Sequence, residues 1–171
     1  MPRYARGFDT EAAFAHLARR DRKLGAWMRR LGPIEADLRW RKPFDPVDAL
    51  ARAILYQQLS GKAAATIVGR VETAIGSRRF HCDTLARRDD ADIRGCGVSG
   101  NKLLALRDLA RREEAGEIPG LRRMSTMSED AIVEALVPIR GIGRWTVEMM
   151  LMFRLGRPDV LPIDDLGIRK G

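Results

Sequence analysis

The sequence predicts an all-α fold, and three observations carry this prediction. Apolar residues recur at the three- and four-residue spacing of a helix face along most of the 171 residues. Capping residues stand before several of these apolar runs, and glycine or proline follows them. The alternation of apolar and polar residues that is typical of strands is nearly absent. Only residues 159–163, held by Pro158 and Pro162, are expected to be extended.

The first helical segment is expected to end at Gly32 and Pro33. Its apolar residues follow the spacing of one buried stripe, which places Trp27 and Met28 in the core. The stripe comprises Phe14, Leu17, Ala18, Leu24, Trp27, Met28 and Leu31.

Two capped helices are expected next. Asp45 reads as an N-cap with Pro46 at the first helical position. Ser60 is expected to cap the helix that follows, and Gly76 to end it. The apolar positions of the two helices are Val47, Leu50, Ala51, Ile54 and Leu55, then Ala64, Ile67, Val68, Val71 and Ile75.

Residues 82–97 are expected to form short polar elements before three more helices. The first opens near Ser99 and ends at Gly116 and Pro119. The segment from Thr126 to Glu129 matches a capping box in front of the second, and the third begins near Arg144. Their apolar positions are Leu103, Leu106 and Leu109, then Ile132, Val133 and Leu136, then Val147, Met150 and Leu151.

Composition excludes several classes of protein. The chain is 45% hydrophobic and 32% charged, which is typical of a soluble globular domain. No apolar run approaches the roughly 18 residues of a membrane span, so no membrane partner is expected. Cys82 and Cys96 cannot form a disulfide framework, which favours a reducing compartment. We therefore expect a cytoplasmic protein.

The net charge of +8 favours an anionic partner, although charge alone does not identify one. Residues 1–44 hold 11 basic and 5 acidic side chains, so most of the excess charge lies there. Arginine, the side chain that binds phosphate with two parallel hydrogen bonds, supplies 26 of the 31 basic residues.

Two motifs are interpreted as structural. Residues 95–100 match the dinucleotide fingerprint G-x-G-x-x-G, but the acidic residues 89–94 before them cannot form the buried strand that the fingerprint requires. A turn in which Ser99 caps a helix is expected instead. His81 and Cys82 are adjacent, yet no further ligand lies at the spacing of a metal site, so no metal centre is predicted.

The segment that indicates chemistry is a tight turn, Gly141-Ile142-Gly143, between two helices. The two glycines permit positive φ angles and let a foreign backbone approach closely. Amides of the turn and of the next helix then point outward at the positive end of a helix dipole, as in a phosphate site. Ile142 is expected to anchor the turn in the core. An ordinary helical hairpin is the alternative.

This turn resembles the helix-hairpin-helix element of DNA repair glycosylases. Downstream, residues 156–167 resemble the Gly/Pro-rich loop that ends in the catalytic aspartate of that superfamily. Within it, Gly-Ile-Gly-Arg-Trp-Thr and Pro-Ile-Asp-Asp-Leu-Gly-Ile are most similar to 3-methyladenine DNA glycosylase II, the AlkA type. The resemblance covers residues 44–171, including Phe44 to Ala64, and leaves residues 1–43 as a basic helical segment.

The resemblance implies an enzyme of base excision repair, which in a bacterium would be cytoplasmic and nucleoid-associated when bound to DNA. It would hydrolyse the N-glycosidic bond of alkylated purines such as 3-methyladenine in duplex DNA, acting as a monomer on DNA with damaged bases. Such an enzyme extrudes the target nucleotide from the stack. Gln58 would fill the vacated space. The residues implied to contact DNA are Gly141, Gly143, Arg144 and Thr146 of the hairpin and Gln57, Gln58, Leu59 and Ser60 of the earlier loop.

The resemblance also implies one catalytic carboxylate. Asp165, the second of a pair, would stabilise positive charge on the sugar and orient or deprotonate water. Asp164 is expected to cap a helix. Bifunctional relatives carry a lysine where this chain has Trp145, which cannot form an imine, so a monofunctional enzyme is expected. Trp145 would offer its π-face to a cationic base, with Met149 and Tyr56 in the same pocket.

No organic cofactor is implied, although hairpin carbonyls from Ile139 to Gly143 could hold a monovalent cation. Family members continue with further helices, whereas this chain ends at Gly171, so the C-terminal helices of the fold are expected to be absent. Two alternatives stay open: a non-catalytic helix-hairpin-helix DNA-binding module, and the same fold acting on another damaged base. A third interpretation is a plain turn in an interaction domain.

Overall fold

The computed structural model describes residues 7–32 and 42–170, and within these ranges all regular structure is helical. Over the described ranges no strand forms, so the predicted all-α fold is confirmed. The helices are α1 (Thr10–Arg20), α2 (Arg22–Leu31), α3 (Pro46–Tyr56), α4 (Gly61–Ile75), α5 (Cys82–Leu85), α6 (Asp90–Gly95), α7 (Gly100–Glu114), α8 (Leu121–Met124), α9 (Glu129–Leu136), α10 (Arg144–Phe153) and α11 (Leu166–Lys170).

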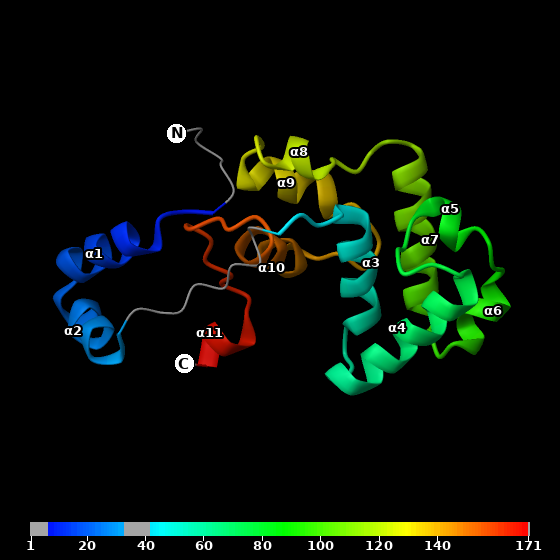
Figure 1. Ribbon diagram of the computed structural model, residues 1–171, viewed down its shortest axis with the longest axis horizontal. Helices are drawn as coiled ribbons and strands as arrows, with labels where there is room; N and C mark the ends of the chain where they lie inside the picture. The colour runs from blue at the N-terminus through cyan, green and yellow to red at the C-terminus, as the bar shows by residue number, and fades with distance from the viewer. Residues whose placement is uncertain (1–6, 33–41, 171) are drawn as a thin grey trace.

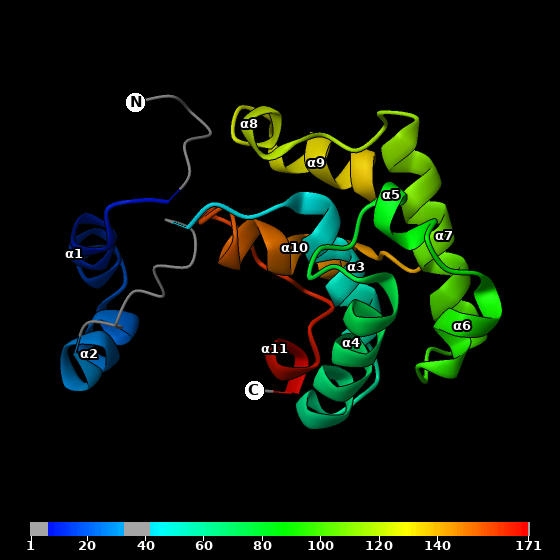
Figure 2. The same ribbon diagram turned by 45° about the vertical axis from the view of Figure 1, so that its right-hand side comes forward.

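The helices form a main body with α1 and α2 set apart at one end (Figure 1). In the main body, α3 lies between α10 on one side and α4 and α7 on the other, and α8 and α9 cover α10 (Figure 2). The short α5 and α6 lie beside α7, at the end opposite α1. Within the described residues, no helix is long and apolar enough to cross a membrane.

One continuous apolar core joins α3, α4, α7, α9 and α10. The faces predicted for these helices are the ones buried, except that Ile67 is only half-buried. Phe80, between α4 and α5, is among the largest fully buried side chains and was not predicted, because a lone aromatic residue in a loop has no helical spacing around it. The core members on α3 and α7 are Val47, Leu50, Ala51, Ile54, Leu55, Leu103, Ala105, Leu106 and Leu109.

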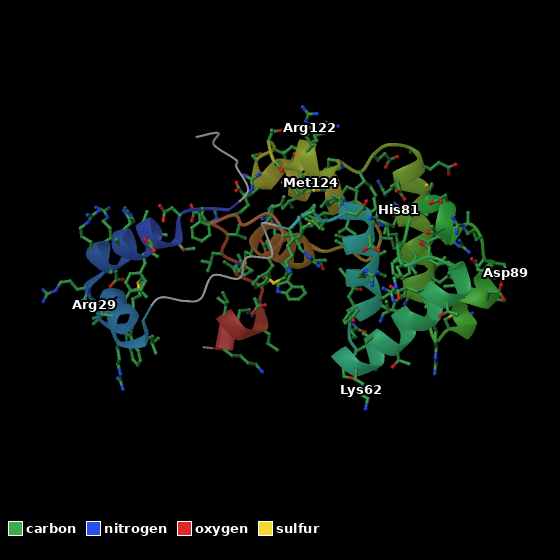
Figure 3. All side chains as sticks on the ribbon, in the orientation of Figure 1. Arg29, Lys62, His81, Asp89, Arg122 and Met124 are labelled. Atoms are coloured by element: carbon green, nitrogen blue, oxygen red, sulfur yellow. The ribbon has the colours of Figure 1, made fainter. Side chains whose placement is uncertain are left out.

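Most of the predicted helix ends are confirmed. Asp45 accepts the amides of Val47 and Asp48 at 2.9 and 3.2 Å. Ser60 and Ser99 cap α4 and α7, and Gly76 ends α4 with a φ of 65°. Lys62, which follows the Ser60 cap, projects outward from the start of α4 (Figure 3).

The capping box predicted at Thr126 is displaced in the structure. Ser128, not Thr126, caps α9, and its hydroxyl accepts the amide of Ala131 at 3.2 Å. The hydroxyl of Thr126 instead donates to the carbonyl of Arg123, in the turn that follows α8. The prediction was wrong because serine and threonine are both favoured at N-caps, and the capping-box pattern began at the first of the two.

The single buried stripe predicted for the N-terminal segment is wrong. The segment divides into two helices at Asp21, whose carboxylate accepts the amides of Lys23 and Leu24 and so begins α2. Trp27 is 59% exposed and Leu31 76% exposed. The two helices pack closely on each other, at a point where a side chain on Gly25 would meet the backbone of Ala18 in α1. The expected stop at Pro33 lies outside the described residues.

The loop after α10 is irregular where an extended segment was expected. It bends at residues 158–159 and turns at residues 163–164. Arg157, nearly fully buried, holds it in place by donating to the carbonyls of Met124 and Met127 at 3.1 and 2.8 Å. This anchorage to α8 and the segment before α9 delivers residues 164–165 to the start of α10.

Candidate functional site

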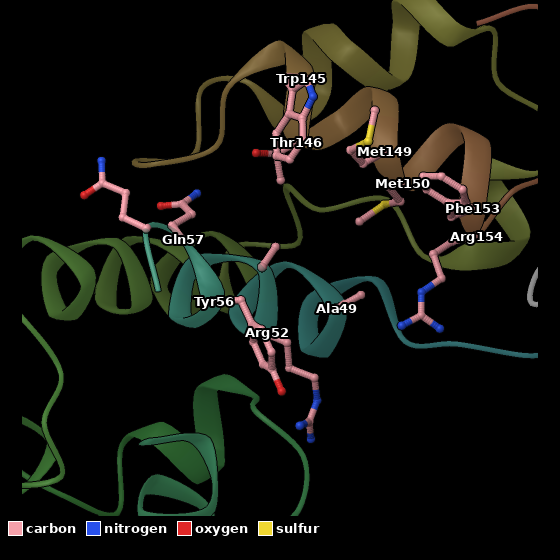
Figure 4. A pocket seen from close by; sticks show the side chains of 12 residues that line it. Ala49, Arg52, Tyr56, Gln57, Trp145, Thr146, Met149, Met150, Phe153 and Arg154 are labelled. Atoms are coloured by element: carbon pink, nitrogen blue, oxygen red, sulfur yellow. The ribbon is translucent and has the colours of Figure 1, made fainter. Parts of the chain in front are cut away.

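A cavity of about 840 Å³ opens between α3 and α10. Figure 4 shows Trp145, Thr146 and Met149 on the α10 side and Tyr56 and Arg52 on the α3 side. Its lining is mainly apolar and aromatic, which suits a flat organic ring. The lining residues are Ala49, Arg52, Ala53, Tyr56, Gln57, Gln58, Trp145, Thr146, Met149, Met150, Phe153 and Arg154.

Asp165 is held by Trp145, whose side chain lines this cavity. The indole Nε1 of Trp145 donates to Asp165 Oδ2 at 2.6 Å. Trp145 lines the cavity and is 45% exposed, so its ring is accessible from the open side. The geometry therefore joins an aromatic wall and a carboxylate whose residues are 20 positions apart in the sequence.

The helix-capping role predicted for Asp164 belongs to Asp165. Asp165 Oδ1 accepts the amides of Gly167 and Ile168 at 2.8 and 3.3 Å, at the start of α11. Asp164 is exposed. The prediction was wrong because it separated capping from catalysis, whereas the two oxygens of one carboxylate can meet different donors.

The same hydrogen bonds determine the charge state of Asp165. The indole of Trp145 makes the largest contribution, and the amides of Ile168 and Gly167 add to it. Each donor favours the ionised form, so together they lower the pKa of Asp165 from its usual value. The carboxylate is consequently ionised at neutral pH, as a group that stabilises positive charge must be.

The two glycines of the hairpin have different roles. Gly141 has a φ of 78°, and an added Cβ would meet Ala105 Cβ at 3.3 Å, so this position requires glycine. Gly143 has a φ of −92° and open space around it. The expectation of positive φ at both glycines is therefore wrong for Gly143, whose space instead permits a close approach from outside. Ile142 is buried and anchors the turn as predicted.

The start of α10 presents backbone donors. Gly143 is its N-cap residue and no side chain caps this end, so the first amides stay available for an anion. Arg144 is exposed, and its guanidinium lies 3.6 Å from the buried carboxylate of Glu148. Thr146 is half-buried and lines the cavity.

The loop between α3 and α4 is tied to the hairpin by Gln57. Its Nε2 donates to the carbonyl of Gly141 at 2.8 Å. Gln58 is exposed and has a φ of 57°, an uncommon conformation for a residue with a side chain. Leu59 is exposed, while the hydroxyl of Ser60 accepts the amide of Ala63 as the cap of α4. Of these four residues, Gln57 and Gln58 line the cavity, and Gln58 is the exposed one of the two.

Arg52, Phe153 and Arg154 are among the residues of the cavity wall that were not predicted. Arg52 is held by Asp48 and Glu72, both at 2.9 Å, and its guanidinium lies 5.0 Å from the ring of Phe80. The signal available in the sequence was its spacing, because Arg52 stands one helical turn before Tyr56.

The described residues contain no cluster of His, Cys, Asp and Glu side chains that could hold a metal ion. The hairpin offers neutral carbonyl oxygens instead. Those of Ile139 and Gly141 each accept one hydrogen bond, from the Ile142 amide and from Gln57. A carbonyl oxygen has two lone pairs, so these residues retain acceptor capacity for a monovalent cation.

Comparison with known proteins agrees with this arrangement. Residues 51–171 match the family model of the HhH-GPD superfamily base excision DNA repair protein. The chain is 41% identical over 128 residues to DNA-3-methyladenine glycosylase 1 of Schizosaccharomyces pombe. That match covers 74% of this chain and 56% of the relative, so the chain spans little more than half the relative's length.

Two solved structures share the fold. A DNA-3-methyladenine glycosidase from Bacillus halodurans superposes with a TM-score of 0.83 at 32% identity, covering 95% of this chain and 73% of that one. A 3-methyladenine DNA glycosylase from Schizosaccharomyces pombe, in complex with abasic DNA, superposes with a TM-score of 0.73 at 34% identity, covering 92% and 77%. The chain belongs to the HhH-GPD superfamily of base excision DNA repair proteins.

Proposed function

We propose that this protein is a monofunctional DNA glycosylase that hydrolyses the N-glycosidic bond of alkylated purines such as 3-methyladenine in duplex DNA. The observation that carries the proposal is the ionised carboxylate of Asp165, held 2.6 Å from the indole Nε1 of Trp145, whose side chain lines an apolar cavity. The names of the similar proteins support the substrate class. The hairpin motif Gly-Ile-Gly-Arg-Trp-Thr and the loop motif Pro-Ile-Asp-Asp-Leu-Gly-Ile support assignment to type II, the AlkA type.

Binding to DNA would combine the hairpin with the neighbouring loop. The uncapped amides at Gly143 and at the start of α10 would hold a backbone phosphate, with Arg144 beside them. Gln58, presented to solvent near the cavity, would enter the space left by the extruded nucleotide. A similar protein forms a complex with abasic DNA, which supports DNA as the partner.

The extruded base would enter the cavity between α3 and α10. An alkylated purine carries positive charge, which the faces of Trp145 and Tyr56 attract. As the bond from the sugar C1′ to the base nitrogen breaks, its electron pair leaves with the base and positive charge develops on the sugar. Asp165 would stabilise that charge and orient water for attack on C1′, leaving an abasic site.

The residue after Arg144 determines the type of reaction. Trp145 has no amine that could displace the base and form an imine with C1′, so water is the expected nucleophile. Purified protein should therefore not become covalently trapped on DNA when borohydride is added. Covalent trapping would contradict the monofunctional assignment.

Release of free base from methylated duplex DNA tests the function, with Asp165→Asn as the matched variant. Asparagine caps helices as well as aspartate does, so α11 and DNA binding should be retained. Base release should fall by about a hundredfold or more, as when one electrostatic group is removed from an active site.

Two other outcomes of this assay would support a different function. Binding of DNA without release by the unmodified chain would indicate a non-catalytic DNA-binding module. Release from deaminated or oxidised DNA, but not from methylated DNA, would indicate another damaged base. The monomeric state, the cytoplasmic location and the occupancy of the hairpin carbonyls by a monovalent cation stay predictions.

A further inference from the structure

One face of α7 supports the hairpin from the side away from the cavity. Ala105, Asp108 and Arg112 stand at the i, i+3 and i+7 positions of this helix, which places them in one row. Ala105 is buried, and its Cβ lies 3.3 Å from the position that a Cβ on Gly141 would occupy. The small side chain therefore lets the turn come close to the helix axis.

The other two residues of the row hold the hairpin backbone directly. Asp108 Oδ2 accepts the amide of Arg140 at 2.9 Å. Arg112 Nη2 donates to the carbonyl of Pro138 at 2.9 Å. With the bond from Gln57 to Gly141, side chains from α7 and from the loop after α3 hold three of the hairpin's backbone groups. None of these three groups is one of the amides at the start of α10.

The carboxylate of Asp108 is itself firmly held. Arg111 donates to its Oδ1 and Arg112 to its Oδ2, both at 3.0 Å. Burial opposes ionisation, but the bonds from the Arg140 amide, Arg112 and Arg111 outweigh it and lower the pKa of Asp108. A negative charge near a phosphate site would normally weaken DNA binding. Here two guanidinium groups neutralise the charge of Asp108. Its hold on the hairpin backbone can therefore outweigh its repulsion of phosphate.

We propose that Asp108 is a positioning residue for DNA binding: by taking the Arg140 amide it fixes the hairpin so that the amides at Gly143 and at the start of α10 face a phosphate. This rests on the proposed function, in which the hairpin binds the DNA backbone. Asp108 does not touch the base or the sugar in this scheme, and the cavity around Trp145 is unaffected by it.

Two substitutions with the same change in charge test the proposal. Asp108→Ala removes the acceptor, whereas Asp108→Asn keeps an oxygen that can accept the Arg140 amide. Affinity is measured on duplex DNA with a tetrahydrofuran abasic analogue at several salt concentrations. Asp108→Ala should raise the Kd about tenfold at every salt concentration, because the lost phosphate contacts are made by neutral backbone amides, whereas the salt dependence comes from Lys and Arg. Asp108→Asn should stay within about threefold of the unmodified protein.

This expectation is opposite to that of simple electrostatics, because removing an acidic residue from a DNA-binding protein ordinarily tightens binding. Glu114→Ala is the control: it lies on the same helix, is exposed and makes the same change in charge. Its Kd should be unchanged or lower. The rate of base release at saturating enzyme should be the same for Asp108→Ala as for the unmodified protein, which separates a binding role from a catalytic one.

Equal affinities for Asp108→Ala and Glu114→Ala would overturn the proposal. So would equally weakened binding by both Asp108 variants, because Asp108→Asn keeps the oxygen that accepts the Arg140 amide. If Asp108→Ala does not fold, Arg112→Lys tests the same contact without a change in charge, because lysine lacks the fork that reaches Pro138 and Asp108 together. Its Kd should rise about threefold, and an unchanged Kd would count against the proposal. Failure of the unmodified protein to bind DNA would instead overturn the proposed function, and this inference with it.

Discussion

Asp165 shows how much one side chain contributes when its two oxygens face different donors. Oδ1 accepts the amides that begin α11, which fixes the backbone of Asp165. Oδ2 accepts the indole of Trp145, which fixes the carboxylate relative to the cavity. The same donors thus fix the position of the carboxylate and favour its ionised form, because every one of them stabilises the negative charge. The hydrogen bond from Trp145 is therefore expected to affect the pH dependence of base release, which an aromatic ring without a donor would not do.

Replacing Trp145 by phenylalanine should move the acidic limb of the pH profile of base release to higher pH. The indole lowers the pKa of Asp165, so without it that pKa rises towards its usual value and the carboxylate becomes protonated at higher pH. Single-turnover rates measured across the acidic range check this prediction. Trp27→Phe, at an exposed position on α2, should leave the profile unchanged. If the acidic limb does not move in Trp145→Phe, the hydrogen bond from Trp145 does not control the pH dependence of base release.

His81 joins three helices at the side of the molecule opposite α1, as Figure 3 shows. Its Nδ1 lies 2.5 Å from Glu113 on α7, and its Nε2 lies 3.4 Å from Asp45, the cap of α3. His81 is also the residue before α5. Burial disfavours the charged ring, but the bond to Glu113 and the charges of Asp45 and Asp48 outweigh it and raise the pKa of His81. The junction is therefore most stable when the imidazole is protonated.

Glu113→Gln should reduce stability most at low pH. A raised pKa means that the stabilisation is fully present below the unfolded value of 6.5 and is lost as pH rises through the folded value. The difference in free energy of unfolding between the two proteins should be about 1 kcal/mol near pH 6. It should then shrink towards alkaline pH. Urea unfolding at several pH values measures it, with the exposed Glu114→Gln as control. A difference that grows with pH would show that the imidazole is not protonated at this junction.

The whole molecule divides into a packed body and an outlying helical pair. The body buries one contiguous apolar cluster, whereas α1 and α2 bury almost none of their larger apolar side chains. Global stability should consequently depend on the body, and in particular on α7. This helix contributes to the core on one side and contacts the hairpin through Asp108 and Arg112.

Leu106→Ala and Leu104→Ala make a matched pair on α7. Leu106 is fully buried in the core, so its truncation leaves a cavity and should lower the free energy of unfolding by about 2–5 kcal/mol. Leu104 is 48% exposed, and its truncation should cost less than about 1 kcal/mol. Chemical denaturation of both variants checks the prediction. Similar losses for the two would mean that the core does not lie where the structure has it.

Local patterns were sufficient for most of the fold. Apolar spacing and caps predicted α3, α4, α7 and α10, because a helix depends on residues within a few positions of one another. The same kind of reasoning failed for Trp27, since periodicity reports which face of a helix is apolar and not whether anything packs against it. It also failed for Thr126, because Thr126 and Ser128 are both residues that favour N-caps, and the tertiary surroundings decide which of them begins α9.

The candidate site was predicted in its parts and not in their connections. The motifs around Gly141 and Asp165 are contiguous in the chain, so the sequence alone was enough to recognise the family and to point to the hairpin, Trp145 and the aspartate pair. The hydrogen bond from Gln57 to Gly141 joins residues 84 positions apart, and that from Arg140 to Asp108 joins residues 32 apart. These contacts, and the different donors that the two oxygens of Asp165 meet, depend on how the helices pack in three dimensions. No pattern of near neighbours contains that information.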